Sequence, residues 1–266
     1  MKKEWTIFLT ALMFLTRLPV PNNIDHSDAY LQKSPKYFPL VGCIAALLSF
    51  AAFLFFHAFV SENTAVLASI IAGILTTGAF HEDGFADSCD AFGGGWTKEK
   101  ILSIMKDSRL GTYGVAGLLL ILAAKFLLLK ELTGIFSFTA RSPTELYSML
   151  AGIFITAHAV SRLMPVLVIQ THEYVTASDG SKSKPLASKK LTATELMLAC
   201  IFGVAPFASL PLNFLLVLLF ILPATFLMAA YFKKWIGGYT GDCLGAVQQV
   251  TEIIFYLSAY LIWKYI

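Results

Sequence analysis

Charged residues are scarce in this chain of 266 residues. Asp, Glu, Lys and Arg make up 14% of it, whereas soluble domains average about 25%. Hydrophobic residues reach 57%, above the roughly 45–50% of soluble domains. No polar block long enough for a soluble domain interrupts the apolar segments. A soluble fold of this size has no place for so much apolar surface. The composition therefore indicates one membrane-embedded domain over residues 1–266.

Cysteine pairs, repeats and strong charge are also lacking. The four cysteines form no CxxC pair, which favours structural thiols over a thiolate metal site. No internal repeat is present, whereas many transporters are built from two repeated halves. The net charge of +3 is too small to indicate a nucleic-acid partner, and it suits an anionic membrane surface and anionic substrates.

Seven segments are apolar enough to cross a bilayer, for which a helix needs roughly 17–25 residues. They must be helices, because an open sheet would leave backbone groups unpaired in lipid. Trp5–Val20 is shorter and contains Arg17, so we expect an amphipathic or re-entrant helix there. The predicted fold is all-α, a polytopic membrane helix bundle with about seven transmembrane helices besides that N-terminal helix. The seven segments are Tyr37–Val60, Thr64–Phe80, Thr112–Leu129, Tyr147–Gln170, Leu191–Ser209, Leu212–Phe232 and Thr251–Ile266.

The positions of lysine and arginine predict the orientation of the chain. Fifteen of the twenty fall before the first span or in alternate loops at 81–111, 171–190 and 233–250. The opposite loops hold only Lys130 and Arg141. Because basic residues are enriched in cytoplasmic loops, this bias predicts a multi-pass protein whose basic loops lie on the cytoplasmic side, and we expect it in a prokaryotic cytoplasmic membrane. The long polar loops, and any active site they build, would face the cytoplasm.

An acidic motif follows the second apolar segment, with the sequence HEDGFADSCDAFGGG at 81–95. Asp83, Asp87 and Asp90 are spaced by four and three residues, which places them on one face of a helix. Such like charges repel, so they need a cation or must stay partly protonated. Hard oxygen ligands suit Mg²⁺, Mn²⁺ or Ca²⁺, and Mg²⁺ completes its shell with water and substrate phosphates. The motif predicts a metal–phosphate site, and a solvated acidic helix start is the alternative.

Two further features lie close behind this motif. The Gly93, Gly94 and Gly95 run has a backbone free to approach a phosphate, although a plain loop fits it equally well. Lys106 and Arg109 are three residues apart and are candidates to clamp phosphate oxygens. The alternative for these two is simple anchoring at the cytoplasmic membrane face.

Asp242 and Arg162 complete the candidate residues. Asp242 lies in a glycine-rich turn and is a candidate to join the same metal site, with a helix N-cap as the alternative. Arg162 lies inside an apolar segment, where an exposed charge is costly, so it must face a polar cavity or a partner. We treat it as a candidate substrate-binding residue, and a purely structural pairing is equally open.

Together, the motifs HEDGFADSCDAFGGG, IMKDSRLGTYG (104–114) and YTGDCLGA (239–246) resemble those of the cobalamin synthase (adenosylcobinamide-GDP ribazoletransferase) family. The segment FLTRLPVP at 14–21 is also similar, and the resemblance extends in order over nearly the whole chain. It implies Mg²⁺-dependent transfer of the cobinamide-phosphate group from adenosylcobinamide-GDP to α-ribazole or α-ribazole 5′-phosphate. The implied products are the cobamide, or its phosphate, and GMP.

The residues are assigned roles on this basis. Asp83, Asp87, Asp90 and Asp242 would hold Mg²⁺ on the donor pyrophosphate, since phosphoryl transfer depends on charge neutralisation and positioning. A second set has a catalytic or substrate-binding role. Lys106 and Arg109 would stabilise the GMP leaving group, and His81 or Glu82 would accept the proton from the ribose hydroxyl. This second set comprises His81, Glu82, Lys106, Arg109, Arg162 and the Gly93, Gly94 and Gly95 run.

Three alternative functions stay open at this point. CDP-alcohol phosphotransferases carry a related acidic pattern, but they have arginine where this chain has Asp87. Intramembrane prenyltransferases have two dense acidic motifs, and only one is dense here. A transporter would place its ionisable residues near the membrane midplane, whereas these acids lie at a span end and in loops. The expected partners are the two small-molecule substrates and the lipid bilayer, and the sequence is compatible with a homo-oligomer.

Overall fold

The computed structural model describes residues 2–21, 27–175 and 190–266. The described residues are almost entirely helical, and their only extended pairing is one bridge between Tyr174 and Tyr239. The prediction of an all-α membrane bundle is therefore confirmed. The α-helices are α1 (Lys2–Leu15), α2 (Asp28–Leu31), α3 (Phe38–His57), α4 (Glu62–Thr77), α5 (Phe80–Gly94), α6 (Lys98–Met105), α7 (Thr112–Thr139), α8 (Pro143–Thr171), α10 (Ala193–Val204), α11 (Leu218–Ile236) and α12 (Gly241–Tyr265). The short 3₁₀ helices are η1 (Ser34–Tyr37), η2 (Ala205–Ser209) and η3 (Leu212–Val217).

Four helical stretches of the described chain are long and apolar enough to cross a membrane, namely Ser34–His57, Thr112–Thr139, Pro143–Thr171 and Leu212–Ile236. A fifth arises if α4 and α5 form one broken span. This number is lower than the predicted seven for local reasons. The segment 191–209 forms only a short α-helix followed by η2, and α12 carries a row of polar side chains in its middle.

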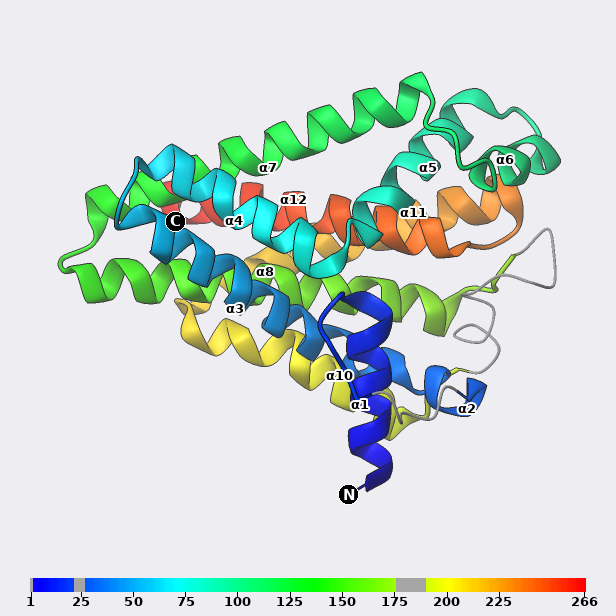
Figure 1. Cartoon of the computed structure of the whole chain (residues 1–266), viewed down its shortest axis with the longest axis horizontal. Coiled ribbons are helices and arrows are strands. Elements are labelled where there is room, and N and C mark those ends of the chain that lie inside the picture. Colours follow the sequence, from blue (N-terminus) through cyan, green and yellow to red (C-terminus); the bar gives the residue numbers. More distant parts are fainter. Residues whose placement is uncertain (1, 22–26, 176–189) are drawn as a thin grey trace.

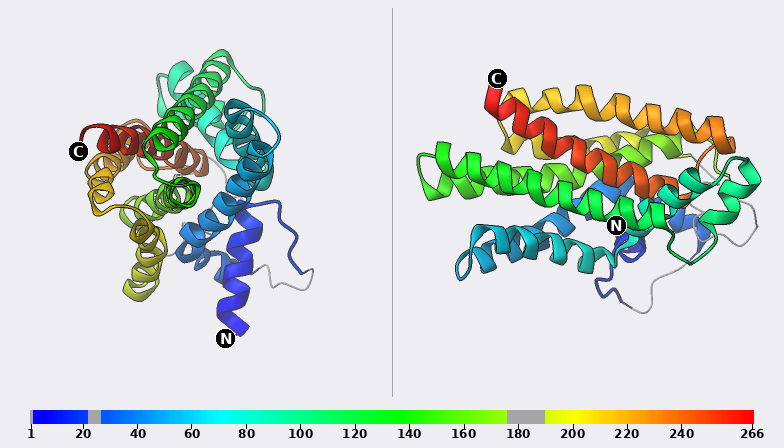
Figure 2. Two further views of the ribbon diagram at one scale, coloured as in Figure 1. Left: turned by 90° about the vertical axis from the view of Figure 1, so that its left-hand side faces the viewer. Right: turned by 90° about the horizontal axis from the view of Figure 1, so that it is seen from above.

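The long helices lie side by side, with α12 among them, and α12 packs against α5, α7, α8 and α11 (Figures 1 and 2). Helices α5 and α6 and the start of α12 lie at one end of the bundle. The α7–α8 corner and the C-terminus lie at the other end (Figure 1). A residue at the start of α12 is therefore brought beside α5, although more than 140 residues separate them in sequence.

The N-terminal helix α1 stands across the long helices (Figure 1). With 14 residues it is too short to cross a bilayer, in agreement with the predicted amphipathic or re-entrant helix. Glu4 fixes it by an ion pair with the buried Lys36 at 2.7 Å and by accepting a hydrogen bond from the Tyr37 hydroxyl at 2.9 Å. After α1 the chain returns to the bundle, where the Arg17 amide donates to the Thr76 carbonyl at 2.8 Å.

A sharp corner between α4 and α5 sets the direction of the acidic helix. Gly78 and Ala79 both adopt left-handed backbone conformations, with φ of 65° and 58°, and the two helix axes differ by 88°. Glycine is suited to such a φ, whereas alanine is strained there. A Cβ atom on Gly78 would also collide with the Arg17 side chain. The corner thus turns the acidic helix away from the course of α4.

Candidate functional site

The carboxylates of α5 and α12 meet where the two helices cross. Gly84 lies so close to α12 that a Cβ atom on it would be 3.0 Å from Asp242 Cα, and Gly245 approaches α5 in the same way. The space beside Gly84 is thus filled by the α12 backbone. The close approach brings Asp242 to the acidic face of α5. Asp242 therefore lies beside the acidic face, and its predicted part in a metal site stays a prediction.

The cluster where α5 and α12 cross consists of four aspartates, namely Asp83, Asp87, Asp90 and Asp242, and their negative charges repel one another. Within the described residues, the charges that act on Asp87 are those of Asp242, Asp83 and Asp90, all of them carboxylates. Burial, together with the charge of Asp83, raises the pKa of Asp242 to about 6. The Thr240 hydroxyl, which caps α12 by accepting from the Cys243 amide, donates to Asp242 Oδ2 at 3.5 Å. A bound cation would relieve the mutual repulsion of these carboxylates.

Asp90 has a different set of partners from the other three aspartates. Its two carboxylate oxygens accept hydrogen bonds from the amides of Gly111 and Gly114, at 2.7 and 2.8 Å. These amides belong to the start of α7, so Asp90 satisfies two donors that a helix N-terminus leaves unpaired. A Cβ atom on either glycine would collide with the Asp90 carboxylate. The spacing of the acidic motif predicted a metal ligand at Asp90 and gave no sign of this capping role.

Lys106 and Arg109 lie on the exposed loop between α6 and α7. Arg109 forms a two-pronged ion pair with Asp107, at 2.6 Å for the shortest contact, and its side chain remains 87% exposed. This pairing holds the pKa of Asp107 at about 2. The loop ends at Gly111, which Asp90 holds, so the two basic residues are tethered next to the acidic helix. Their predicted contact with phosphate stays a prediction.

The Gly93, Gly94 and Gly95 run forms the end of α5 instead of an open phosphate loop. The Gly95 amide donates to the Ala91 carbonyl at 2.9 Å, as in a continuing helix. A Cβ atom on Gly93 would collide with the Tyr113 ring, and one on Gly95 would collide with Ile101. Close packing of α5 against α6 and α7 is thus the visible reason for two of these glycines. The predicted phosphate contact stays untested.

His81 and Glu82 are directed into the protein interior. Only 4% and 7% of these residues are exposed, so neither lies on the open acidic face with Asp83. His81 lines an apolar cavity with Phe14, Phe38 and Phe80. Their assignment as proton acceptors has no support from this geometry, although no bound substrate tests it.

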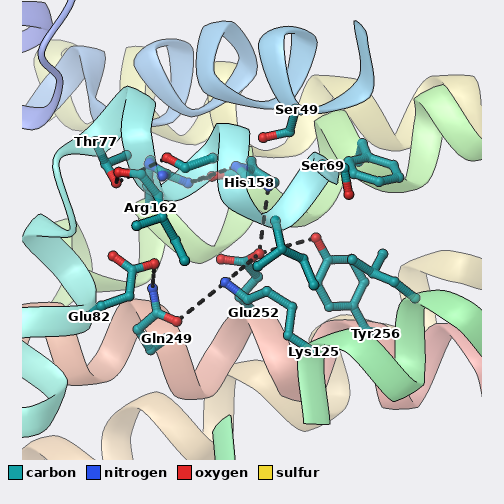
Figure 3. Close-up of a pocket in the computed structure, with 15 residues that line it drawn as sticks. Ser49, Ser69, Thr77, Glu82, Lys125, His158, Arg162, Gln249, Glu252 and Tyr256 are labelled. Atoms are coloured by element: carbon teal, nitrogen blue, oxygen red, sulfur yellow. Dashed lines mark hydrogen bonds and ion pairs between the residues drawn. The ribbon is translucent and has the colours of Figure 1, made fainter. Parts of the chain in front are cut away.

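Glu82 belongs to a polar network inside the bundle (Figure 3). Its Oε1 accepts from Gln249 Nε2 at 3.0 Å, and Gln249 Oε1 accepts from Lys125 Nζ at 3.3 Å. Arg162 faces the same interior, where its Nη1 donates to the His158 carbonyl at 3.1 Å. These residues line a cavity of about 20 Å³, which has room for a water molecule but not for a nucleotide. The prediction that Arg162 faces a polar cavity is confirmed, and a direct substrate contact for it stays untested.

Glu252 is the centre of this network. Lys125 Nζ lies 3.3 Å from Glu252 Oε1, and His158 Nε2 lies 3.6 Å from the same oxygen. The Tyr256 hydroxyl and the Gln248 amide also donate to its carboxylate, at 3.1 and 2.7 Å. A buried charge is stable only when paired and hydrogen-bonded in this way.

This network was not predicted from the sequence. Lys125, Arg162 and Glu252 each lie in a different apolar segment. Ionisable residues inside spanning segments are expensive and must find partners, so three such residues, including Arg162, were a signal that one interior cluster exists. Sequence spacing alone does not reveal which of them meet.

Magnesium fits the acidic face, with one restriction. Within residues 2–21, 27–175 and 190–266, no group of three or more His, Cys, Asp or Glu side chains forms a ready-made metal cage. Mg²⁺ does not need one, because it typically binds one or two carboxylates and completes its shell with water and substrate phosphates. Asp83 is exposed, and Asp87 and Asp242 are half-buried, so these three carboxylates are accessible. They could bind an Mg²⁺ ion that is also coordinated by the phosphate oxygens of a substrate.

The fold and this face define a multi-pass helical membrane protein with a candidate metal–phosphate site at one end of its bundle. The chain belongs to the cobalamin-5-phosphate synthase family, whose family model matches residues 7–260. This confirms the resemblance found in the sequence motifs.

Curated relatives resemble the chain over nearly its whole length. The adenosylcobinamide-GDP ribazoletransferase of Leptospira biflexa is 40% identical over 270 residues, covering 98% of this chain and 97% of the relative. The enzyme of the same name from Vibrio parahaemolyticus is 39% identical over 264 residues, covering 97% and 93%. That of Shewanella amazonensis is 40% identical over 266 residues, covering 99% and 98%. No solved structure matches the chain.

Proposed function

We propose that the protein transfers the cobinamide-phosphate group of adenosylcobinamide-GDP to α-ribazole or α-ribazole 5′-phosphate, releasing GMP. The family match over residues 7–260 carries this proposal. The acidic face of α5 and α12 supports it, because a pyrophosphate-bearing donor brings the phosphate oxygens that such a face needs for a shared cation. The relatives' names specify the donor and the ribazole acceptor.

In the proposed reaction a ribose hydroxyl of the acceptor attacks the phosphorus that carries the cobinamide group. The bond from this phosphorus to the oxygen bridging the two phosphates breaks, and GMP leaves with that oxygen. Bound Mg²⁺ would neutralise the pyrophosphate charge and the charge that develops on the leaving phosphate. Asp83, Asp87 and Asp242 would hold the ion, and their placement on two crossing helices would orient the pyrophosphate for in-line attack.

Asp90, Lys106 and Arg109 would act around this centre. Asp90 would hold the start of α7 and the end of the basic loop through its bonds to Gly111 and Gly114. Lys106 and Arg109 would bind the phosphate of the departing GMP, since exposed guanidinium and ammonium groups are suited to phosphate oxygens. Arg109 would exchange its Asp107 partner for the nucleotide phosphate.

We further propose that the acidic face lies at the cytoplasmic side of a prokaryotic inner membrane. The described basic residues of α6, of the loop after it and of the end of α11 share one end of the bundle with α5 (Figure 1). That end fits the cytoplasmic side because basic residues are retained there. Both expected substrates are water-soluble phosphate compounds or nucleosides of the cytoplasm.

The decisive experiment measures GMP release and cobamide formation by the purified protein in detergent or liposomes. Adenosylcobinamide-GDP and α-ribazole are supplied with Mg²⁺ or with EDTA. We expect product only with Mg²⁺, and loss of most activity in Asp87→Asn, because the amide cannot replace a carboxylate ligand. Asp28→Asn, which changes a carboxylate exposed on α2, is the matched control and keeps wild-type activity.

Each result bears on a separate part of the proposal. Folded wild-type protein that forms no cobamide with Mg²⁺ present would refute the reaction. Full activity of Asp87→Asn would retain the reaction and remove this carboxylate from the metal shell.

A further inference from the structure

One buried amide on α12 ties together the helices that surround the acidic face. Gln249 is 1% exposed, and its Nε2 donates to Glu82 Oε1 on α5 at 3.0 Å. Its Oε1 accepts from Lys125 Nζ on α7 at 3.3 Å. Figure 3 shows Gln249 between the other two side chains. A single side chain therefore fixes α12 against two neighbouring helices at once.

The partners of Gln249 lie next to the proposed metal ligands in sequence. Glu82 immediately precedes Asp83 on α5. Gln249 follows Asp242 by seven residues on α12, which is two helical turns or about 10 Å along the axis. The bond between Glu82 and Gln249 thus joins the two backbones that carry the carboxylates, a short distance inside the bundle.

Another contact between these helices, the close packing of two glycines, has no such directional preference. Gly84 and Gly245 let α5 and α12 approach closely, and close packing of small residues restricts the distance between helices. It does not prevent α12 from sliding or rotating against α5. Hydrogen bonds to a fixed amide do restrict both movements, because donor and acceptor tolerate little change in distance and angle.

The neighbouring residue provides a comparison. Gln248 is equally buried, but its Nε2 donates to Ser161 Oγ on α8 at 3.1 Å and to Glu252 Oε2 at 2.7 Å. Helix α8 contributes no carboxylate to the acidic face. The two glutamines also share a hydrogen bond, from Gln249 Nε2 to Gln248 Oε1 at 2.9 Å. Of the two, Gln249 is the one that bonds to the helix that carries Asp83 and Asp87.

We propose that Gln249 is a positioning residue, which sets the place of Asp242 relative to Asp83 and Asp87 through its bonds to Glu82 and Lys125. This inference rests on the proposed function of the three aspartates as Mg²⁺ ligands. Gln249 touches neither metal nor substrate. Its effect is on the geometry with which the two helices present their carboxylates.

The test compares Gln249→Leu with Gln248→Leu in the full-length protein. Both variants lose a buried amide, so both should unfold at a lower temperature than the wild type. Two measurements separate them, namely the Mg²⁺ concentration for half-maximal GMP release and Mn²⁺ binding with added inorganic pyrophosphate. The second is followed by electron paramagnetic resonance and requires no turnover.

We expect Gln249→Leu to raise the Mg²⁺ concentration for half-maximal GMP release about tenfold and to weaken Mn²⁺ binding by the same factor. Losses of this size are usual for residues that orient metal ligands. Gln248→Leu removes one acceptor of Gln249 but leaves its bonds to Glu82 and Lys125 in place, so both quantities should stay within about twofold of the wild type. Gln249→Asn, whose shorter amide cannot reach both partners, replaces Gln249→Leu if that variant does not fold.

The outcomes distinguish the inference from the function beneath it. Equal metal affinity in the Gln249 and Gln248 variants, with an active wild type, would show that Gln249 is merely structural. A wild type that neither releases GMP nor binds Mn²⁺ would overturn the proposed function, and the positioning role with it.

Discussion

Asp90 belongs to the acidic motif, but its role in the structure is to cap the start of α7. It shares a helix face with Asp83 and Asp87, yet both of its oxygens accept backbone amides of α7. Those amides come from residues 21 and 24 positions further along the chain, so no local pattern announces them. The i, i+4 and i+3 spacing correctly predicts a shared helix face, but it does not distinguish a metal ligand from a helix cap.

We expect Asp90→Ala to destabilise the protein by about 1–2 kcal/mol, the usual cost of removing a helix cap. Activity should fall with it, because the basic loop before α7 loses its anchor. The Mg²⁺ concentration for half-maximal activity should remain unchanged. Thermal unfolding in detergent and a Mg²⁺ titration measure the two effects. A large shift in the Mg²⁺ titration with unaltered unfolding would instead place Asp90 in the metal shell.

At the scale of helices, the crossing of α5 and α12 determines where the carboxylates lie. Gly84 and Gly245 lie at the point of closest approach, and the buried Gln249 bonds to Glu82 deeper inside the bundle. The apolar runs predicted most helices near their observed places, and the carboxylate spacing predicted the acidic face. They did not predict that Gly84 serves packing, because its neighbour Asp242 is brought there only by the fold.

Substitution of Gly84 by alanine should therefore disturb the site. A Cβ atom there would lie 3.0 Å from both Asp242 Cα and Asp242 O, so the α12 backbone has to move. We expect a loss of about 1–3 kcal/mol in stability, as for other overpacked positions, together with a several-fold loss of cobamide formation.

Gly134→Ala on α7 is the control, at a glycine with no candidate role in the site. Its Cβ atom would meet no atom within 4 Å, and alanine favours the helix by about 1 kcal/mol. The unfolding temperature and the rate of GMP release are measured for both variants and for the wild type, and they show whether the alanine at position 84 disturbs the site. Equal behaviour of the two variants would contradict the role of Gly84 in close packing.

At the scale of the whole molecule, the sequence predicts what depends on composition and misses what depends on distant contacts. The apolar surplus correctly predicted a membrane bundle, and the isolated charge of Arg162 correctly predicted a polar interior. The bond between Glu82 and Gln249 joins residues 167 apart, and Lys125 and Gln249 are 124 apart. Such pairs depend on which helices become neighbours. The same limit explains the number of spans, since hydropathy does not show that α4 ends in a sharp corner.

The orientation of the bundle is the last property that the charge pattern predicts. Arg109 lies at the end that carries the acidic face, and Arg141 lies at the opposite end, between α7 and α8. Because the basic loops cluster near Arg109, that end should stay in the cytoplasm during membrane insertion. In a background without native cysteines, Arg141→Cys should react with a membrane-impermeant maleimide on intact spheroplasts. Arg109→Cys should react only after the membrane is opened.

Both positions are exposed, so a difference in labelling reports sidedness and not burial. The cysteine-free parent must retain cobamide formation, since Cys243 is buried beside Asp242. Labelling of Arg109→Cys from outside would reverse the orientation and place the acidic face away from cytoplasmic nucleotides. The proposed reaction would then lack access to its donor, because a charged GDP conjugate does not cross the hydrocarbon core unaided.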